Sequence, residues 1–187
     1  MDFDRVVRKR ASIKKFGLKK PGIEQIMELV ETANTAPSPG NLQILKYILV
    51  ENEEKIEKIA KACRQDWIKK APWIVVVCSD SKKVDIMYDE RADKYVKHHV
   101  GAAVENFLLK VTNEGLACCW VGAFSDITIR NALSIPDNIE IEVVLPVGYT
   151  SRLSREKQKP KPHLYTRTYF ETYGNSFKED YRKAWTD

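Results

Sequence analysis

Hydrophobic residues recur along the chain at two spacings, and these spacings predict an alternation of helices and strands. Steps of three and four residues are typical of an amphipathic helix, and they mark residues 94–114, where Val96, Val100 and Val104 share one apolar stripe. A continuous apolar run at residues 73–78 predicts a central strand that is buried on both faces. Further helices are expected at residues 2–10, from Pro21 onwards, at 53–63 and at 126–133, and further strands at 47–51, 116–121 and 139–148.

Capping and turn-forming residues divide these elements. Asp2 or Asp4 can cap the first helix, and Asp126 can cap the helix that ends at residue 133. Gly115 is placed to end the long helix. Residues 36–41 hold two prolines and a glycine, which predicts a loop. The helix that Pro21 can open is expected to bury Ile23, Ile26, Met27, Val30 and Ala33.

The composition changes after Thr150. Residues 152–163 are basic and contain prolines, which fits either a solvated loop or an anion-binding segment. The following residues are rich in aromatic side chains, so we expect them to pack on a surface outside the compact core, of this domain or of a second subunit. The aromatic residues are Tyr165, Tyr169, Phe170, Tyr173, Phe177, Tyr181 and Trp185.

Overall composition is that of an ordinary globular protein. The 187 residues carry a net charge of +5, with 43% hydrophobic and 30% charged residues, and no apolar run approaches the ~18 residues that span a membrane. The start of the chain is charged and lacks an apolar export segment, so we expect a cytoplasmic protein. We expect one domain over residues 1–187, with residues 151–187 as a basic loop and an aromatic C-terminal extension.

The four cysteines give little support for a metal site, because no two of them form a Cys-x-x-Cys pair. We expect plain reduced thiols. A redox role for the adjacent Cys118 and Cys119 is the alternative.

A short basic segment is the first candidate for chemistry. In an extended chain Arg10, Ser12 and Lys14 lie on one side, about 6.6–7 Å apart per pair. A guanidinium, a hydroxyl and an ammonium at that spacing suit an elongated anionic ligand with a phosphate at one end.

Five motifs along the chain support this interpretation and extend it. In this order they resemble the nitroreductase family over residues 5–175, nearly the whole chain. The motifs are Lys9-Arg10-Ala11-Ser12-Ile13-Lys14, Ala36-Pro37-Ser38-Pro39-Gly40-Asn41-Leu42-Gln43, Glu105-Asn106, Gly115-Leu116-Ala117-Cys118-Cys119-Trp120-Val121-Gly122-Ala123-Phe124 and Leu145-Pro146-Val147-Gly148-Tyr149.

The resemblance implies an α+β fold, with a mixed, mainly antiparallel sheet flanked by helices and an extended C-terminal tail that crosses the partner of a homodimer. It also implies FMN at the dimer interface. Arg10 and Ser12 would hold the phosphate, with Lys161 as a second contact, and Lys14 would lie near the pyrimidine edge. The full set of cofactor-binding residues that it implies is Arg10, Ala11, Ser12, Lys14, Pro37, Ser38, Pro39, Asn41, Gly122, Ala123, Lys159 and Lys161.

Two groups in that set have particular roles in the family pattern. Pro37, Ser38 and Asn41 would come from the partner subunit and face the flavin rings. Backbone N–H groups near Gly122 and Ala123 would meet flavin N5 and O4, and Gly122 permits a close approach because it has no Cβ. A flavin supplies its own hydride chemistry, so no catalytic side chain and no metal is expected.

The activity that the resemblance implies is transfer of hydride from NAD(P)H through flavin N5 to an organic acceptor such as a nitro compound or a quinone, in ping-pong fashion. Partners would be these small molecules and a second copy of the chain, without nucleic acid or membrane. The alternatives are a non-catalytic flavin-binding module for storage or redox sensing, a polyanion-binding protein that uses residues 152–161, and flavin-dependent fragmentation or dehalogenation.

The chain departs from the family pattern at several positions. Ile44-Leu45 replaces Pro-Trp, Glu105 replaces glutamine, and Lys161 replaces arginine. Ala11 replaces an arginine or histidine, and Thr150 replaces a proline.

Several residues near the motifs also have structural interpretations. Trp120 is expected in the core rather than against the flavin, and His98 and His99 at the surface or at a helix end. Asn41 and Gln43 fit either a turn or a ligand contact. The charged residues 89–93 fit either a solvated face or an active-site flap.

Overall fold

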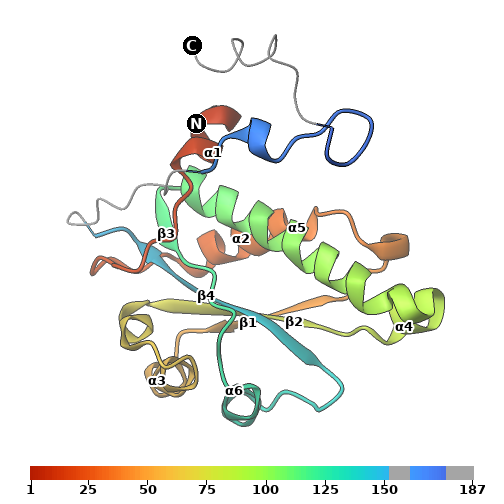
Figure 1. Cartoon of the computed structure of the whole chain (residues 1–187). Helices are drawn as coiled ribbons and strands as arrows, with labels where there is room; N and C mark the ends of the chain where they lie inside the picture. Colours follow the sequence, from red (N-terminus) through yellow and green to blue (C-terminus); the bar gives the residue numbers. More distant parts are fainter. Residues whose placement is uncertain (152–160, 176–187) are drawn as a thin grey trace.

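A four-stranded sheet forms the centre of the computed structural model, which describes residues 1–151 and 161–175 (Figure 1). The strands follow the order β1-β2-β4-β3, and each neighbouring pair is antiparallel. The prediction of a mainly antiparallel sheet is therefore confirmed. The strands are β1 (Leu45–Val50), β2 (Trp73–Ser79), β3 (Leu116–Cys118) and β4 (Glu140–Tyr149).

Helices cover both faces of this sheet. In Figure 1, α2 and α5 lie on one face, and α3 and α6 lie on the other. The shorter α1 and α4 both contact α5. The α-helices are α1 (Phe3–Lys9), α2 (Ile23–Asn34), α3 (Glu53–Ala62), α4 (Lys82–Tyr88), α5 (Ala92–Asn113) and α6 (Asp126–Leu133). The short 3-10 helices are η1 (Pro39–Asn41), η2 (Asp66–Lys70), η3 (Asp89–Arg91) and η4 (Leu164–Thr166).

The two faces of β2 belong to two separate parts of the core. Val75 and Val77 pack into the cluster that contains Phe107 of α5, whereas Ile74 and Val76 pack into the cluster on the α3 and α6 side. Every residue of β2 is buried, as the apolar run predicts. Side chains of successive strand residues point to opposite faces, so a strand between two helical layers needs apolar residues at every position.

Most helix ends follow their capping residues. The Asp2 carboxylate accepts a hydrogen bond of 2.9 Å from the backbone N–H of Arg5 at the start of α1. Gly115 follows α5 with φ +69°, a conformation that glycine adopts without a steric penalty. The cap predicted for Asp126 is wrong, because α6 begins at that residue and Ser125 is its N-cap.

Three other expectations need correction. The strand predicted over residues 116–121 ends at Cys118. In α2 the structure buries Leu29, which was not predicted, and leaves Ile23 and Met27 exposed. The helix α4 was not predicted at all. Val84 is its only buried residue, and one buried apolar position gives no periodic pattern.

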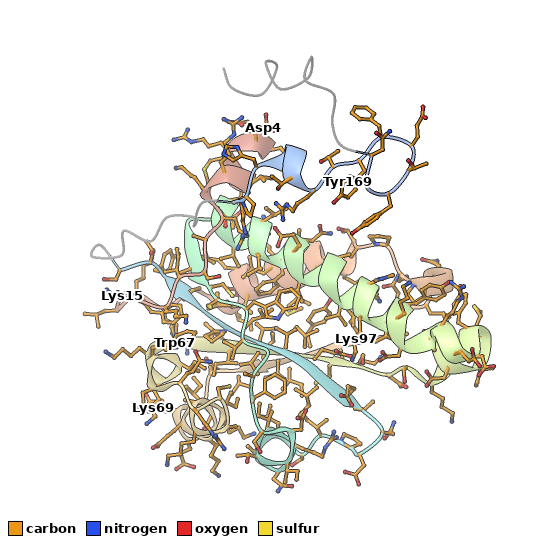
Figure 2. The ribbon with its side chains drawn as sticks, in the orientation of Figure 1. Asp4, Lys15, Trp67, Lys69, Lys97 and Tyr169 are labelled. Atoms are coloured by element: carbon orange, nitrogen blue, oxygen red, sulfur yellow. The ribbon has the colours of Figure 1, made fainter. Side chains whose placement is uncertain are left out.

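A polar contact ties α5 to the sheet. The side chain of Glu142 in β4 is only 5% exposed, and it accepts hydrogen bonds from Ser79 Oγ at 2.7 Å and from Lys97 Nζ at 2.9 and 3.1 Å. Figure 2 labels Lys97 in this region. Burial alone would lower the pKa of Lys97, but the hydrogen bond and the charge of Glu142, with nearby Asp93, raise it above its ordinary value. Lys97 therefore compensates a carboxylate that is otherwise removed from water.

Replacing Lys97 with methionine should lower the free energy of unfolding by about 1–2 kcal/mol at pH 7. This is less than a fully buried ion pair would lose, because the Lys97 side chain is 47% exposed and solvent screens its charge. A raised pKa means that this stabilisation is present below the unfolded-state value of about 10.4 and is lost as the pH rises through the folded-state pKa. Urea unfolding of both proteins between pH 7 and pH 11 measures the difference. Lys94→Met, on the exposed part of the same helix, is the control, and an equal loss in both variants would contradict the assignment.

The described part of the C-terminal extension is largely exposed. Tyr169 (labelled in Figure 2) is 38% exposed and Tyr173 is 94% exposed, and their ring centroids lie 4.8 Å apart. Both rings are thus outside the compact core, as the sequence predicts. The aromatic residues Phe177, Tyr181 and Trp185 lie outside the described residues, so the predicted crossing to a partner subunit stays a prediction.

Candidate functional site

The basic segment at residues 10–14 lies beside the edge strand of the sheet. Arg10 follows the last residue of α1, and residues 10–15 belong to no helix or strand. The backbone N–H of Ile13 donates to the carbonyl of Cys118 at 2.9 Å, and that of Gly17 donates to Tyr149 at 2.8 Å. These bonds hold the segment against β3 and the end of β4.

The polar side chains of this segment have different surroundings. Arg10 Nε lies 3.7 Å from a carboxylate oxygen of Glu105 on α5, and the Arg10 side chain is 23% exposed. Ser12 and Lys14 are exposed, and Lys14 Nζ lies 5.4 Å from the centroid of the Trp67 ring. Within residues 1–151 and 161–175, Lys14 has no carboxylate partner at salt-bridge distance, so its charge is available to an anionic ligand.

A cavity of about 240 Å³ opens beside Arg10. Lys9, Arg10 and Ala11 line one side of it, and Thr112 and Cys118 line another. Two cationic side chains at an open cavity form a donor set that suits a phosphate. The residues present therefore fit the phosphate end of the predicted FMN, although Glu105 competes for Arg10.

The loop that was predicted at residues 36–41 contains η1 and two residues with positive φ, Gly40 at 55° and Asn41 at 58°. A Cβ on Gly40 would lie 2.9 Å from Met87 Sδ and 3.0 Å from Tyr88 Oη, so a larger residue would require these side chains to shift, in addition to the positive φ that favours glycine. Gln43 Nε2 donates to Ser38 Oγ at 3.3 Å. Asn41 and Gln43 thus have the structural role in a turn, and Asn41 is also exposed and open to a ligand.

The segment after β3 carries Gly122 and Ala123, and both residues are exposed. Val121 exchanges two backbone hydrogen bonds of 3.0 Å with Val144, which fixes the chain just before Gly122. Trp120 is 41% exposed, so its predicted place in the core is wrong. The strand ends before this residue, and its ring lies near Gly122, where an added Cβ would be 3.7 Å from Trp120 Nε1.

The structure thus brings some predicted site residues together and leaves others apart. The segment of Arg10 and the segment that leads to Gly122 meet through the bond from Ile13 to Cys118. The loop of residues 37–41 lies elsewhere along α5, next to Ala102, one helical turn from Glu105. Lys161 is exposed, and Lys159 lies outside the described residues.

Sequence reasoning missed His99. It predicted a surface or helix-end position for both histidines, which holds for His98, whereas His99 is only 2% exposed. The signal was present in the spacing, because position 99 lies in phase with Val96 and Ala103 on the buried side of α5. Burial lowers the pKa of His99, so its imidazole is neutral at pH 7.

The four cysteines are free, as predicted, and all four are buried. Burial raises the pKa of Cys63 and of Cys78 to about 11, which keeps both thiols protonated and unreactive. Among the described residues no cluster of His, Cys, Asp and Glu could hold a metal ion. In that same part of the chain no helix is long and apolar enough to cross a membrane.

Comparison with known proteins adds to this geometry. The family model described as "Nitroreductase family" matches residues 7–83 and 61–149. Among curated proteins the chain is similar to an iodotyrosine deiodinase of Thermotoga neapolitana, with 24% identity over 160 residues, 77% of this chain and 86% of that protein. It is also similar to an oxygen-insensitive NADPH nitroreductase of Helicobacter acinonychis, with 26% identity over 179 residues, 76% of this chain and 85% of that protein. Among solved structures it is similar to a nitroreductase family protein from Clostridium novyi NT, with a TM-score of 0.76 and 27% identity over 95% of this chain and 97% of that one.

Proposed function

Because the chain belongs to the nitroreductase family, we propose that it is an FMN-dependent oxidoreductase that takes hydride from NAD(P)H and passes it to an organic acceptor such as a nitro compound or a quinone. FMN is the cofactor that members of this family typically bind. The observation that carries the proposal is the bond from Ile13 to Cys118, because it holds the basic segment beside the strand that leads to Gly122.

In this proposal Arg10, Ala11 and Ser12 hold the phosphate end of FMN beside the cavity at the end of α1. Two planar N–H groups of Arg10 can bond two phosphate oxygens at once, and the Ser12 hydroxyl adds a third donor. Lys161 is a second cation for the phosphate, and Lys159 is its neighbour in the sequence.

Lys14, Gly122 and Ala123 would hold the flavin rings. The exposed backbone at Gly122 and Ala123 would donate to the polar edge of the ring, and Gly122 would allow a close approach because it has no Cβ. The loop with Pro37, Ser38, Pro39 and Asn41 belongs to the site through a second copy of the chain, so the working protein is a homodimer.

Bound FMN would supply the hydride chemistry, while the protein would bind and orient the flavin and adjust its electrostatic surroundings. Lys14 stabilises the negative charge that reduction brings to the pyrimidine edge, because an ammonium fixed near developing charge favours the charged form. No side chain needs to act as an acid, base or nucleophile toward the ring.

Purified protein supplied with FMN should be yellow and should lose its flavin absorbance when NADH or NADPH is added without oxygen. A nitro compound or quinone should then restore the absorbance, since the reduced protein passes its electrons on. Visible absorption spectra measure each step. Protein that stays colourless with added FMN would contradict the proposal, and protein that binds FMN but is not bleached by either nucleotide would favour a storage or sensing module.

Dehalogenation is the second candidate, because one relative is an iodotyrosine deiodinase. Dehalogenation differs from reduction of a nitro compound or quinone only in the molecule that accepts the electrons from the flavin. Release of iodide from 3-iodotyrosine by the chemically reduced, FMN-loaded protein distinguishes the two reactions.

A further inference from the structure

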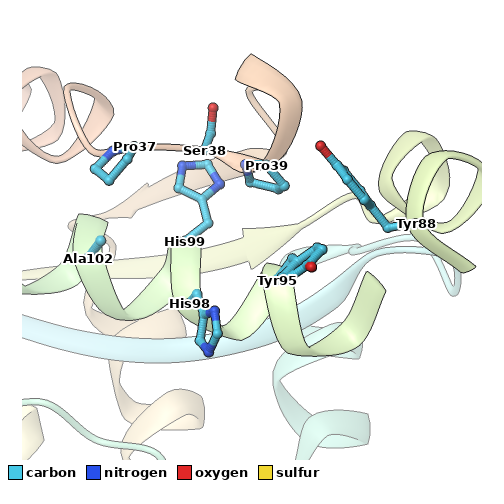
Figure 3. Close-up of a pocket in the computed structure, with 8 residues that line it drawn as sticks. All are labelled: Pro37, Ser38, Pro39, Tyr88, Tyr95, His98, His99 and Ala102. Carbon is cyan, nitrogen blue, oxygen red and sulfur yellow. The ribbon is translucent and has the colours of Figure 1, made fainter. Parts of the chain in front are cut away.

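A second cavity, of about 400 Å³, lies between α5 and the loop that carries Pro37 and Pro39 (Figure 3). Tyr88 at the end of α4 and Tyr95 in the first turns of α5 close one side of it. Their rings meet edge to face at 5.0 Å between centroids, so this wall is a fixed aromatic surface. The cavity is large enough for one or two fused rings.

The described residues that line this cavity carry no charged side chain, which limits the class of ligand that it can bind. Prolines, alanine, serine, tyrosines and histidines line the cavity, and no Asp, Glu, Lys or Arg is among the described residues that do so. A carboxylate, an ammonium or a pyrophosphate would enter without a counter-ion, which is unfavourable. The walls therefore favour a flat and uncharged molecule.

One polar atom at this cavity has no hydrogen-bond partner within the described part of the chain. His99 is 2% exposed, and its Nδ1 is buried without a hydrogen bond to any described residue. Figure 3 shows the His99 ring pointing toward the loop between Pro37 and Pro39, whereas His98 points away from it. Buried polar groups are nearly always paired, so an unpaired imidazole nitrogen at a cavity indicates a partner that enters from outside.

We propose that His99 positions an uncharged, planar aromatic acceptor in this cavity by donating its Nδ1–H to a carbonyl or nitro oxygen of the ring. The inference rests on the proposed function, because it names a residue that selects the acceptor, and because the proposed homodimer brings the loop with Pro37 and Pro39 to the flavin of the other copy. Tyr88 and Tyr95 contact the ring, Pro37 and Pro39 cover it, and His99 selects rings that carry oxygen. His99 is thus a specificity-determining residue.

The test compares two probes that differ only in their oxygens, 2-methyl-1,4-naphthoquinone and 2-methylnaphthalene. Both are titrated into the oxidised, FMN-loaded protein without NAD(P)H, so no turnover occurs, and calorimetry measures the two affinities. The protein should prefer the quinone by about tenfold or more, since the quinone satisfies a buried donor and the hydrocarbon does not. His99→Phe should abolish this preference, because it removes the hydrogen bond to the quinone oxygen. The affinity for 2-methylnaphthalene should stay within about twofold, because this hydrocarbon makes no hydrogen bond with His99.

The variants separate this role from a structural one. His99→Phe removes an unpaired buried polar group, so its melting temperature should equal or exceed that of the unmodified protein. His99→Gln retains a donor and should retain part of the preference, which keeps the test decisive if the phenylalanine variant folds poorly. His163→Phe, the same substitution at an exposed residue that does not line the cavity, should leave the preference unchanged.

The inference is overturned if His99→Phe keeps the preference for the quinone, or if His99→Gln and His163→Phe lose it equally. NMR correlation spectra of the imidazole groups give a second readout, in which the quinone should shift the signals of His99 more than those of His98. If the protein takes up no FMN, the same titrations on the flavin-free protein still test His99. Failure of the proposed function is therefore distinguishable from failure of this inference.

Discussion

Replacing Arg10 with alanine is expected to weaken FMN binding about tenfold to a hundredfold, because hydrogen bonds to a charged group contribute about 1.5–3 kcal/mol. Arg10 lies at the mouth of the cavity that fits the phosphate, and it is the most enclosed cation of its segment. Titration of the flavin-free protein with FMN, followed by flavin fluorescence, measures the dissociation constant. The loss should shrink as salt is added, since screening weakens a contact between charges.

Two further variants make this result specific. Arg5→Ala removes an exposed arginine of α1 and should leave FMN affinity within about twofold, because screened surface charges contribute little. Glu105→Gln removes the charge of the carboxylate that lies 3.7 Å from Arg10 and should tighten binding a few-fold, because this carboxylate no longer competes with the phosphate for the guanidinium. Equal affinities for the Arg10 and Arg5 variants would mean that the phosphate binds elsewhere.

Replacing Phe107 with alanine should lower the free energy of unfolding by about 3–5 kcal/mol, the largest stability effect that we expect in this chain. Phe107 is fully buried on α5 and belongs to the cluster that joins this helix to β2. Loss of its ring leaves a cavity that close-packed neighbours fill only in part. For a chain of this length the melting temperature should fall by about 6–20 °C.

Urea and thermal unfolding at one fixed protein concentration test this prediction, because association between copies would otherwise change the apparent stability. Phe3→Ala is the matched control, since Phe3 is 71% exposed and its loss should cost less than about 0.5 kcal/mol. Similar losses in both variants would show that α5 is not held by core packing.

The fold could be predicted where local chemistry and burial agree. The apolar run of β2 indicated a strand between two layers, and Asp2 and Gly115 marked the ends of two helices correctly. The prediction failed where an element makes few apolar contacts, as in α4, or where a large aromatic residue follows the end of a strand, as at Trp120. In both cases tertiary contacts, rather than local preference, decide the outcome.

The candidate site was predictable in its chemistry but not in its assembly. The motifs indicated that Arg10, Ser12 and Lys14 bind an anion, because their side-chain types alone suggest it. The pairing of Arg10 with Glu105 depends on how α1 meets α5, which no local pattern encodes. His99 was predicted at the surface because histidine is more common there. Its spacing from Val96 and Ala103 nevertheless places it on the buried side of α5.

The long helix α5 has a consequence for regulation. His99 and Ala102 face the aromatic cavity, and Glu105, one turn further on, touches the arginine beside the phosphate cavity. A ligand that shifts this part of α5 from one cavity would therefore also shift residues beside the other cavity. If a ligand in the aromatic cavity changes the affinity of the phosphate cavity by some factor, thermodynamics requires the reverse effect as well. A ligand in the phosphate cavity then changes the affinity of the aromatic cavity by the same factor.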